Sequence, residues 1–390
     1  MKTNPHFQEL TREYIFPAIE RKVFAQKKET SEEIFNLGVG DVSLPLAPAF
    51  SKAIQEAVQE MATHQGKKGY GPEVGYSFLK TSIWENHPAK ERISVEEIFI
   101  SEGISRDAAD LQQLFSLEAT VGIMDPTYPL YKDACILAGR KKKIHLLPCN
   151  KENNFTPLPP SYPLDFVYLC TPNNPTGLAL TKEDLQKWIA YAKKYGSVLL
   201  IDNAYEAFIS SKDVPSTIYA LEGAEEVAIE MRSFSKTAGF TGLRCGYTVI
   251  PRKIAQGKLH EMWKIRQTIQ TNGISYPIQK GAAALFSAQG KKEAQEQIAS
   301  YQKEALILYK GLKELNYTIF GGKDSPFLWW EIPSSFSSSW DFFDHLLQKC
   351  RLICVPGIGF GSEGEGYVRL SGFLPPQKAE KILERLCNLL

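Results

Sequence analysis

Short apolar segments alternate with helical patterns through the middle of this 390-residue chain, and this alternation is what most constrains the fold. Segments of this length, rich in β-branched and aromatic residues, are typical of strands. They span Glu97–Ile100, Thr120–Met124, Lys143–Leu147, Phe166–Cys170, Val198–Asp202, Val227–Arg232 and Cys245–Ile250. Apolar strands separated by helices indicate a mostly parallel sheet with helices on both faces, and ligands bind such sheets at the carboxyl ends of the strands.

Helical patterns flank and connect these strands. The clearest span Thr11–Lys28, Pro48–His64, Arg106–Leu117, Leu130–Ala138 and Lys182–Tyr195, with a short strand at Ile34–Leu37. The last third of the chain has a different pattern, with helices Tyr276–Ala288 and Lys292–Glu314, short strands Thr318–Phe320, Phe327–Ile332 and Tyr367–Leu370, and two further helices. We therefore expect an α/β protein with a large domain over residues 45–275 and a smaller α+β domain built from residues 1–44 and 276–390.

Composition narrows the classes of partner. The net charge of +1 gives no reason to expect nucleic acid or an anionic membrane surface, and no segment reaches the ~20 apolar residues of a membrane span. The basic run Arg140–Lys143 is expected to be a solvated loop or strand start. The polar N-terminus and seven scattered cysteines without a Cys-x-x-Cys pair favour a cytoplasmic protein with reduced thiols and no metal site.

The strongest motif is Ser233-Phe234-Ser235-Lys236, which directly follows a predicted strand and precedes Arg244-Cys245-Gly246. A lysine that forms a Schiff base must be held desolvated and aimed at an aldehyde. Ser233, Ser235 and Arg244 can converge on one phosphate, with Gly239 and Gly242 allowing tight turns around it. The alternative is a polar loop with a solvated lysine.

Two further motifs end neighbouring strands. Thr171-Pro172-Asn173-Asn174-Pro175-Thr176-Gly177 forms a rigid loop in which an asparagine could bind a cofactor oxygen, or it is a simple turn. Asp202 ends the apolar run from Val198, where a carboxylate is costly unless it meets a cation such as a protonated pyridine nitrogen. The alternative is that Asp202 caps the next helix.

In their order along the chain, the motifs Asn-Pro-Thr-Gly, Asp-x-x-Tyr, Ser-x-Ser-Lys and Arg-x-Gly resemble the aminotransferases of pyridoxal phosphate fold type I. The resemblance narrows to the LL-diaminopimelate aminotransferase family through Arg12–Pro17, Gly40–Val42, Gly69–Gly75, Asp125–Pro129 and Pro356–Gly361. It covers nearly the whole chain. It implies amino transfer between LL-diaminopimelate and 2-oxoglutarate, giving tetrahydrodipicolinate and glutamate in lysine biosynthesis.

The resemblance also implies roles for individual residues. Lys236 is expected to bind pyridoxal 5′-phosphate and to move the proton, and Asp202 to pair with the pyridine nitrogen. The other expected cofactor contacts are Tyr70 from a partner subunit, Ile104, Ser105, Tyr128, Asn174, Tyr205, Ser233, Ser235, Arg244 and Asn272. The expected substrate contacts are Tyr14, Gly40, Glu73 from the partner subunit, Ser105, Tyr128, Asn174, Asn272 and Arg369. These roles imply a homodimer that acts on small amino and 2-oxo acids.

One segment departs from the family. Ser101-Glu102-Gly103-Ile104-Ser105-Arg106-Asp107 has Ser105 where the family has a lysine that also contacts substrate, and Arg106 is the residue that could compensate. Gly103 still allows the turn that presents helix N–H groups to a phosphate. The departure bears on the amino donor and leaves the expected cofactor unchanged.

Other functions are compatible with parts of the pattern. An aminotransferase for another amino acid, or a carbon–sulfur lyase, shares the same cofactor motifs, and a non-catalytic binding protein could keep the fold. Retention of Lys236, Asp202 and Arg369 argues for an enzyme. Gly359-x-Gly361-x-x-Gly364 fits a dinucleotide-binding pattern, but a strand follows it and no βαβ unit precedes it.

Overall fold

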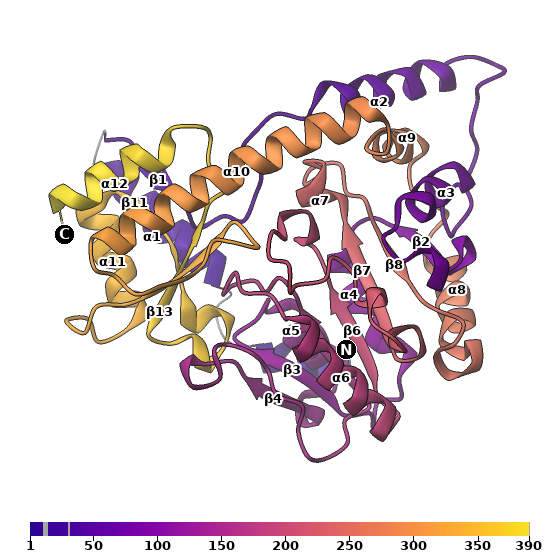
Figure 1. The fold of residues 1–390 in the computed structure, drawn as a ribbon, viewed down its shortest axis with the longest axis horizontal. Helices are drawn as coiled ribbons and strands as arrows, with labels where there is room; N and C mark the ends of the chain where they lie inside the picture. The colour runs from indigo at the N-terminus through magenta and orange to yellow at the C-terminus, as the bar shows by residue number, and fades with distance from the viewer. Residues whose placement is uncertain (11–14, 30–31, 390) are drawn as a thin grey trace.

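A computed structural model describes residues 1–10, 15–29 and 32–389 (Figure 1). Its main sheet has seven strands, in the order β2-β8-β7-β6-β5-β3-β4. These are β2 (Ile98–Ser101), β3 (Val121–Asp125), β4 (Ile144–Pro148), β5 (Phe166–Cys170), β6 (Val198–Asp202), β7 (Ala228–Ser233) and β8 (Gly246–Val249). Strand β8 runs antiparallel to both of its neighbours, and the remaining pairs are parallel. The predicted mostly parallel α/β sheet is therefore confirmed.

The burial of the strands follows from their place in this sheet. Every residue of β5, β6 and β7 is buried, because these strands lie inside the sheet and are covered on both faces. The edge strand β4 has only Leu147 buried. The connecting helices include α4 (Ile104–Leu111), α5 (Leu130–Leu137) and α6 (Lys182–Tyr195).

A second, antiparallel sheet has the order β12-β13-β10-β9. Its strands are β9 (Ile319–Gly321), β10 (Phe327–Glu331), β12 (Val355–Pro356) and β13 (Tyr367–Ser371). The short strand β1 (Phe35–Asn36) pairs with β11 (Leu352–Ile353), so the N-terminal segment lies against the C-terminal third of the chain. The helices of this region are α1 (Ile15–Glu29), α11 (Ser339–Cys350) and α12 (Lys378–Leu389). The domain boundaries given above remain a prediction.

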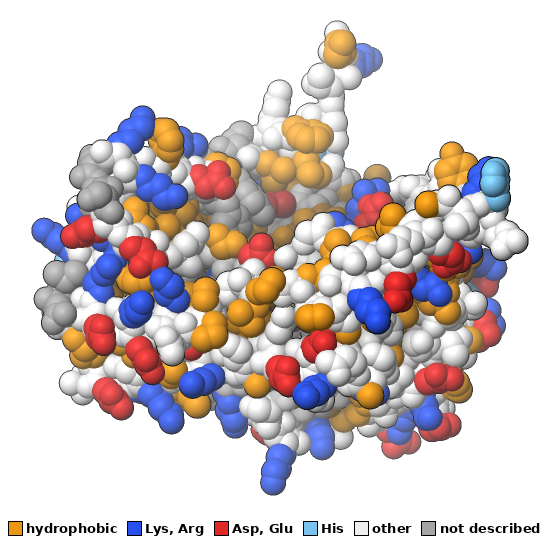
Figure 2. Space-filling view, turned by 90° about the horizontal axis from the view of Figure 1, so that it is seen from above, with side chains coloured by type: hydrophobic (Ala, Val, Ile, Leu, Met, Phe, Trp, Pro, Cys, Tyr) orange, Lys and Arg blue, Asp and Glu red, His pale blue; other side chains and the backbone are white. Residues whose placement is uncertain are grey.

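One long helix, α10 (Ala288–Glu314), connects the two regions. It contacts α2 (Pro48–Met61) near one end and α12 near the other, and Figure 1 shows it running along the molecule between them. None of the helices in the described part of the chain combines the length and hydrophobicity that crossing a bilayer requires. Acidic and basic side chains are interspersed on the face seen in Figure 2.

Most predicted elements agree with the structure, and β5, β6 and α6 have the predicted ends. Helix α4 begins two residues earlier than predicted and ends at Leu111, where a short 3₁₀ turn continues the chain to Leu114. Helix α9 (Tyr276–Ala284) is shorter than predicted, and α10 begins correspondingly earlier. Two helices, α3 (Ser77–Asn86) and α8 (Lys258–Gln270), were not predicted individually. In α8, polar residues such as His260 and Gln267 occupy part of the buried face and interrupt the apolar period.

The interpretation of the basic run was wrong for its first residue. Arg140 is only 1% exposed, and its guanidinium donates to the backbone carbonyls of Gln112 (2.8 Å), Phe115 (2.7 Å) and Ser116. These carbonyls follow the end of α4. Those of Gln112 and Ser116 also accept the backbone N–H groups of Phe115 and Ala119, whereas no backbone donor of the described residues reaches the Phe115 carbonyl, which the buried guanidinium satisfies. The lysines that follow are exposed or half-exposed, as expected.

This contact predicts a stability effect. Arg140→Ala leaves the buried Phe115 carbonyl without a donor and removes the guanidinium contacts to Gln112 and Ser116, and we expect it to lower the free energy of unfolding by about 3 kcal/mol. The exposed Lys142→Ala is the matched control from the same run, with an expected change within about 0.5 kcal/mol. Urea unfolding followed by circular dichroism measures both. Equal effects of the two substitutions would show that the guanidinium contacts contribute nothing.

Candidate active site

Three neighbouring parallel strands end at one cavity of about 320 Å³. Cys170, Asp202 and Ser233 are the last residues of β5, β6 and β7, and all three line it. The segment from Val39 to Asp41 and two residues of the second sheet, Phe327 and Arg369, also line it. The remaining lining residues are Ile104, Ser105, Tyr128, Tyr131, Asn174, Ala204, Tyr205, Ser235, Lys236, Thr241 and Arg244. The cavity thus lies where the parallel arrangement predicts a ligand site.

Asp202 is a buried carboxylate without a cation. It is 7% exposed, and its oxygens accept hydrogen bonds from the Tyr131 hydroxyl (2.5 Å) and from the backbone N–H of Ala204 (3.2 Å). No lysine, arginine or histidine of the described residues forms an ion pair with it. Burial raises the pKa of Asp202 to about 6, against the effect of these hydrogen bonds. A cationic group in the cavity would stabilise the charged form.

Arg369 is a buried cation that has no anionic partner among the described residues. Its guanidinium is 2% exposed and donates to Asn174 Oδ1 (2.6 Å) and to the Gly38 carbonyl (2.6 Å), while its Nε has no partner. Burial lowers the pKa of Arg369 to about 10, and no carboxylate of the described residues lies against it. A buried arginine with an unused donor is suited to bind a ligand carboxylate.

Lys236 lines the same cavity as these two charges. Its Nζ donates to the Gly40 carbonyl (2.5 Å) and lies 5.3 Å from the centre of the Phe373 ring. Burial lowers the pKa of Lys236 to about 8, and Arg369 contributes in the same direction. About a tenth of this amine is therefore unprotonated at pH 7, far more than for an ordinary lysine, and the unprotonated form is the nucleophile.

The fourth feature is a cradle of donors suited to a phosphate. Ser233 caps the short helix α7 (Phe234–Thr237), and the Arg244 guanidinium donates to Ser235 Oγ (3.3 Å). Gly103, with φ of +117°, precedes α4, and a Cβ on this residue would lie 2.5 Å from Arg244 Nη2. Only glycine therefore lets the arginine lie across the first turn of α4, whose free N–H groups add positive potential.

The comparisons with known proteins agree with this geometry. The pattern of the family described as aminotransferase class I and II matches residues 32–386. Two relatives are the LL-diaminopimelate aminotransferases of Lawsonia intracellularis, 45% identical over 98% of both chains, and of Lachnospira eligens, 43% identical over 99% of both. The solved L,L-diaminopimelate aminotransferase of Chlamydomonas reinhardtii superimposes with a TM-score of 0.94 at 36% identity, covering 100% of this chain and 98% of that one.

This chain belongs to the class I and II aminotransferase family. The resemblance found from the motifs is confirmed, and so is the enzyme class, a pyridoxal-phosphate-dependent aminotransferase. The aspartate aminotransferase of Thermotoga maritima has the same fold, with a TM-score of 0.86 at 19% identity.

The cavity of this aminotransferase fits its cofactor, pyridoxal 5′-phosphate. Asp202 lacks the cation that a protonated ring nitrogen provides, Arg244 and the serines form the phosphate cradle, and Lys236 provides the amine for the aldehyde. Arg369 remains without an anion after the cofactor charges are matched, and the carboxylate of an amino acid substrate would complete it.

Twelve of the predicted site residues lie together at this cavity, which supports their assignment. They are Gly40, Ile104, Ser105, Tyr128, Asn174, Asp202, Tyr205, Ser233, Ser235, Lys236, Arg244 and Arg369. Three others do not line the cavity of their own chain. Tyr70 is 90% exposed, Asn272 is exposed and Glu73 is half-exposed. Tyr14 lies outside the described residues.

Sequence reasoning missed Tyr131, which bonds Asp202, and Asp41, whose charge raises the pKa of Lys236. Tyr131 lies in the first turn of the helix that begins at Leu130, three residues after Tyr128, and the two rings meet edge to face. That spacing was the available signal. Asp41 had none beyond its place in the Gly40-Asp41-Val42 motif.

The structure shows where Ser105, which replaces the lysine of the family, and its neighbour Arg106 lie. The Ser105 side chain lies against the cavity and hydrogen-bonds with the Tyr128 hydroxyl. Arg106 does not line the cavity, because its Nε donates to Asp110 (2.6 Å) on the outer part of α4, where its side chain is 57% exposed. Arg106 therefore does not place a positive charge where Ser105 lies.

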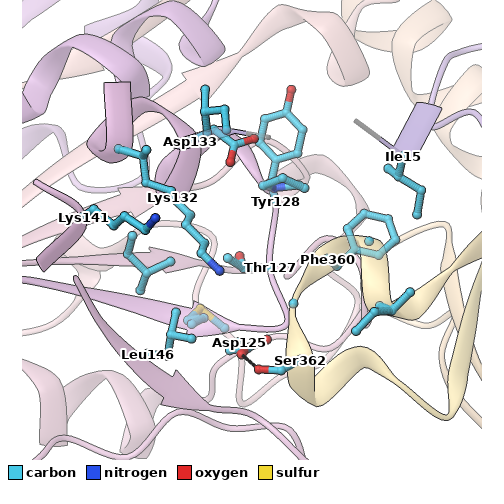
Figure 3. Close-up of a pocket in the computed structure, with 18 of the residues that line it drawn as sticks. Ile15, Asp125, Thr127, Tyr128, Lys132, Asp133, Lys141, Leu146, Phe360 and Ser362 are labelled. Carbon is cyan, nitrogen blue, oxygen red and sulfur yellow. Dashed lines mark hydrogen bonds between the residues drawn. The ribbon is translucent and has the colours of Figure 1, made fainter. Parts of the chain in front are cut away.

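A larger cavity of about 760 Å³ lies on the other side of Tyr128, between β3 and the segment Ile358–Ser362 (Figure 3). Lys132 extends into it, and Asp125 accepts a hydrogen bond from the Ser362 hydroxyl (2.6 Å). It does not contain Lys236, Asp202 or Arg369. The smaller cavity, which gathers all three, is therefore the candidate active site.

The cradle predicts the effect of a single methyl group. Gly103→Ala displaces the Arg244 guanidinium, and we expect the affinity of the apoprotein for pyridoxal phosphate to fall at least about tenfold, the effect of losing one charge-assisted hydrogen bond. Quenching of tryptophan fluorescence during titration measures it. Gly196→Ala is the control, because Gly196 also has a positive φ of +71° but nothing within 4 Å of its Cβ position. Unchanged affinity in Gly103→Ala would contradict this role for the cradle.

Proposed function

We propose that this aminotransferase exchanges an amino group between LL-diaminopimelate and 2-oxoglutarate, giving tetrahydrodipicolinate and glutamate in lysine biosynthesis in the cytoplasm. The main support is the near-complete coverage, at 43–45% identity, by relatives named for this activity. The cavity adds the chemical requirement common to all such substrates, a buried and unpaired Arg369 for the α-carboxylate.

The side chains of the cavity divide the reaction among them. Bound pyridoxal phosphate supplies a carbon that accepts the amino group and a ring that accepts electrons from the substrate α-carbon. The side-chain carboxylate of Asp202 would pair with the ring nitrogen of the cofactor. Arg369 would orient the substrate by binding the substrate's α-carboxylate. Asn174 uses its carbonyl oxygen to hold Arg369, which leaves its amide N–H groups to donate to the cofactor.

Lys236 is the residue that moves the proton. Its amine lies in the same cavity as Asp202 and Arg369, and its lowered pKa lets it accept a proton from the substrate α-carbon and return it near neutral pH. Phe327 and Tyr205 pack edge to face (5.1 Å between centroids) beside the arginine and help to exclude water from this wall.

The substrate is tested with purified, cofactor-loaded enzyme. We expect glutamate formation from 2-oxoglutarate to be fastest with LL-diaminopimelate, compared with meso-diaminopimelate and single-ammonium amino acids. Arg369→Lys is expected to lower kcat/KM at least about 100-fold, because a lysine cannot form two parallel hydrogen bonds to a carboxylate.

Arg106→Ala serves as the matched control for the loss of an arginine charge, with an expected change within about twofold because Asp110 already neutralises that charge. Faster transamination of another amino acid would overturn the proposed substrate. Release of ammonia and pyruvate from a cysteine conjugate would instead favour the carbon–sulfur lyase.

We also infer that the enzyme is a homodimer in which each subunit completes the other's site. Tyr70, Glu73 and Asn272 lie near one another on the surface, since Gly273 packs against the carbonyls of Gly71 and Pro72. Two adjacent segments that carry three predicted site residues outside their own cavity fit a role at the cavity of a partner. Glu73 would there recognise the distal ammonium of the diamino acid.

Mixing inactive variants tests this arrangement. Lys236→Ala and Tyr70→Ala, unfolded and refolded together, are expected to regain about a quarter of wild-type activity, because half of the dimers then carry one intact site. The matched mixture of Lys236→Ala with Arg369→Ala regains nothing, since both residues line the cavity of one chain. Equal recovery in both mixtures, or in neither, would contradict shared sites.

A further inference from the structure

The Tyr131 hydroxyl is a side-chain donor to the buried carboxylate of Asp202. Tyr131 lies in the first turn of α5, is 1% exposed, and donates its single proton to Asp202 Oδ2 at 2.5 Å. Its ring stacks on Tyr168, with centroids 4.8 Å apart and planes 13° apart, and meets Tyr128 edge to face at 5.9 Å. The hydroxyl is thus held in place by packing on two sides.

A phenol donor favours the charged carboxylate over the protonated one. Asp202 has no cation among the described residues, and its other oxygen receives only the longer bond from Ala204 N–H. The Tyr131 hydroxyl is therefore the strongest contact that keeps Asp202 ionised and fixes the plane of its carboxylate. Since burial opposes this ionisation, losing the hydroxyl would weaken the anion that a ring cation needs.

We propose that Tyr131 is a positioning residue, which holds Asp202 as an oriented anion so that the protein binds the protonated ring nitrogen of pyridoxal phosphate. The proposal rests on the cofactor chemistry of the family and is independent of which amino acid is the substrate. It also explains why a tyrosine is buried beside a carboxylate, an arrangement that costs desolvation of both groups.

The test compares cofactor affinities of apoprotein variants. In Tyr131→Phe, which keeps the ring packing, we expect pyridoxal phosphate to bind about 10–100-fold more weakly, the range for losing a hydrogen bond to a charged group. Tyr168→Phe is the matched control, because its equally buried hydroxyl donates to the Ala108 backbone carbonyl (2.6 Å) and does not contact Asp202. We expect less than about a threefold change there.

A second ligand separates positioning from a general loss of structure. With 1-deazapyridoxal 5′-phosphate, which has carbon in place of the ring nitrogen, Tyr131→Phe and wild type are expected to bind equally. The same substitution made in Asp202→Ala is expected to have no further effect on pyridoxal phosphate binding. An equal loss for both ligands, or in Tyr168→Phe, would overturn the proposal, and so would unchanged affinity in Tyr131→Phe.

A further variant covers the case in which Tyr131→Phe does not fold. Incorporating 3-fluorotyrosine at position 131 keeps the packing and makes the hydroxyl more acidic, so the donated hydrogen bond strengthens. We then expect tighter binding of pyridoxal phosphate and no change for the deaza analogue, and weaker or unchanged binding of pyridoxal phosphate would overturn the proposal. Failure of the substrate assay with normal cofactor binding would concern the proposed function alone.

Discussion

Two buried charges of opposite sign, Asp202 and Arg369, line one cavity and are not paired with each other or with any other described residue. An unpaired buried charge is costly, so a fold that retains two of them requires a ligand that carries both complementary charges. A pyridinium ring bound together with an amino acid carboxylate meets this requirement. Lys236, in the same cavity, provides the amine that binds the cofactor aldehyde and moves the proton of the substrate.

The two sheets supply different residues of the site. The parallel strands deliver Asp202 and Ser233 to one edge, while the antiparallel sheet supplies Arg369 from β13. Gly103 allows Arg244 to cross the start of α4, so the phosphate site also depends on one missing side chain. Substrate and cofactor therefore meet where the two sheets face each other, which is common for enzymes whose sites lie between structural units.

Much of this arrangement could be predicted from local signals. Helix α6 has the predicted ends because Thr181 and Asp184 form a capping box and Gly196 ends the helix at a positive φ. The site residues that follow buried strands, among them Asp202, were also predictable, because the ends of parallel strands share an edge. The narrower family and its cofactor came from the order of several motifs, each of which was weak alone.

Other features depend on contacts between segments far apart in the sequence. The Tyr131–Asp202 bond joins residues 71 positions apart, and the burial of Arg140 depends on carbonyls more than 20 residues before it. By itself, the sequence determined the sheet, the family chemistry and most of the residues that line the cavity, because strand ends and motif spacing are local properties. Only the tertiary structure decided that Arg106 pairs with Asp110 outside the cavity and that Tyr131 supports the buried acid, because packing alone sets which side of a helix faces a ligand.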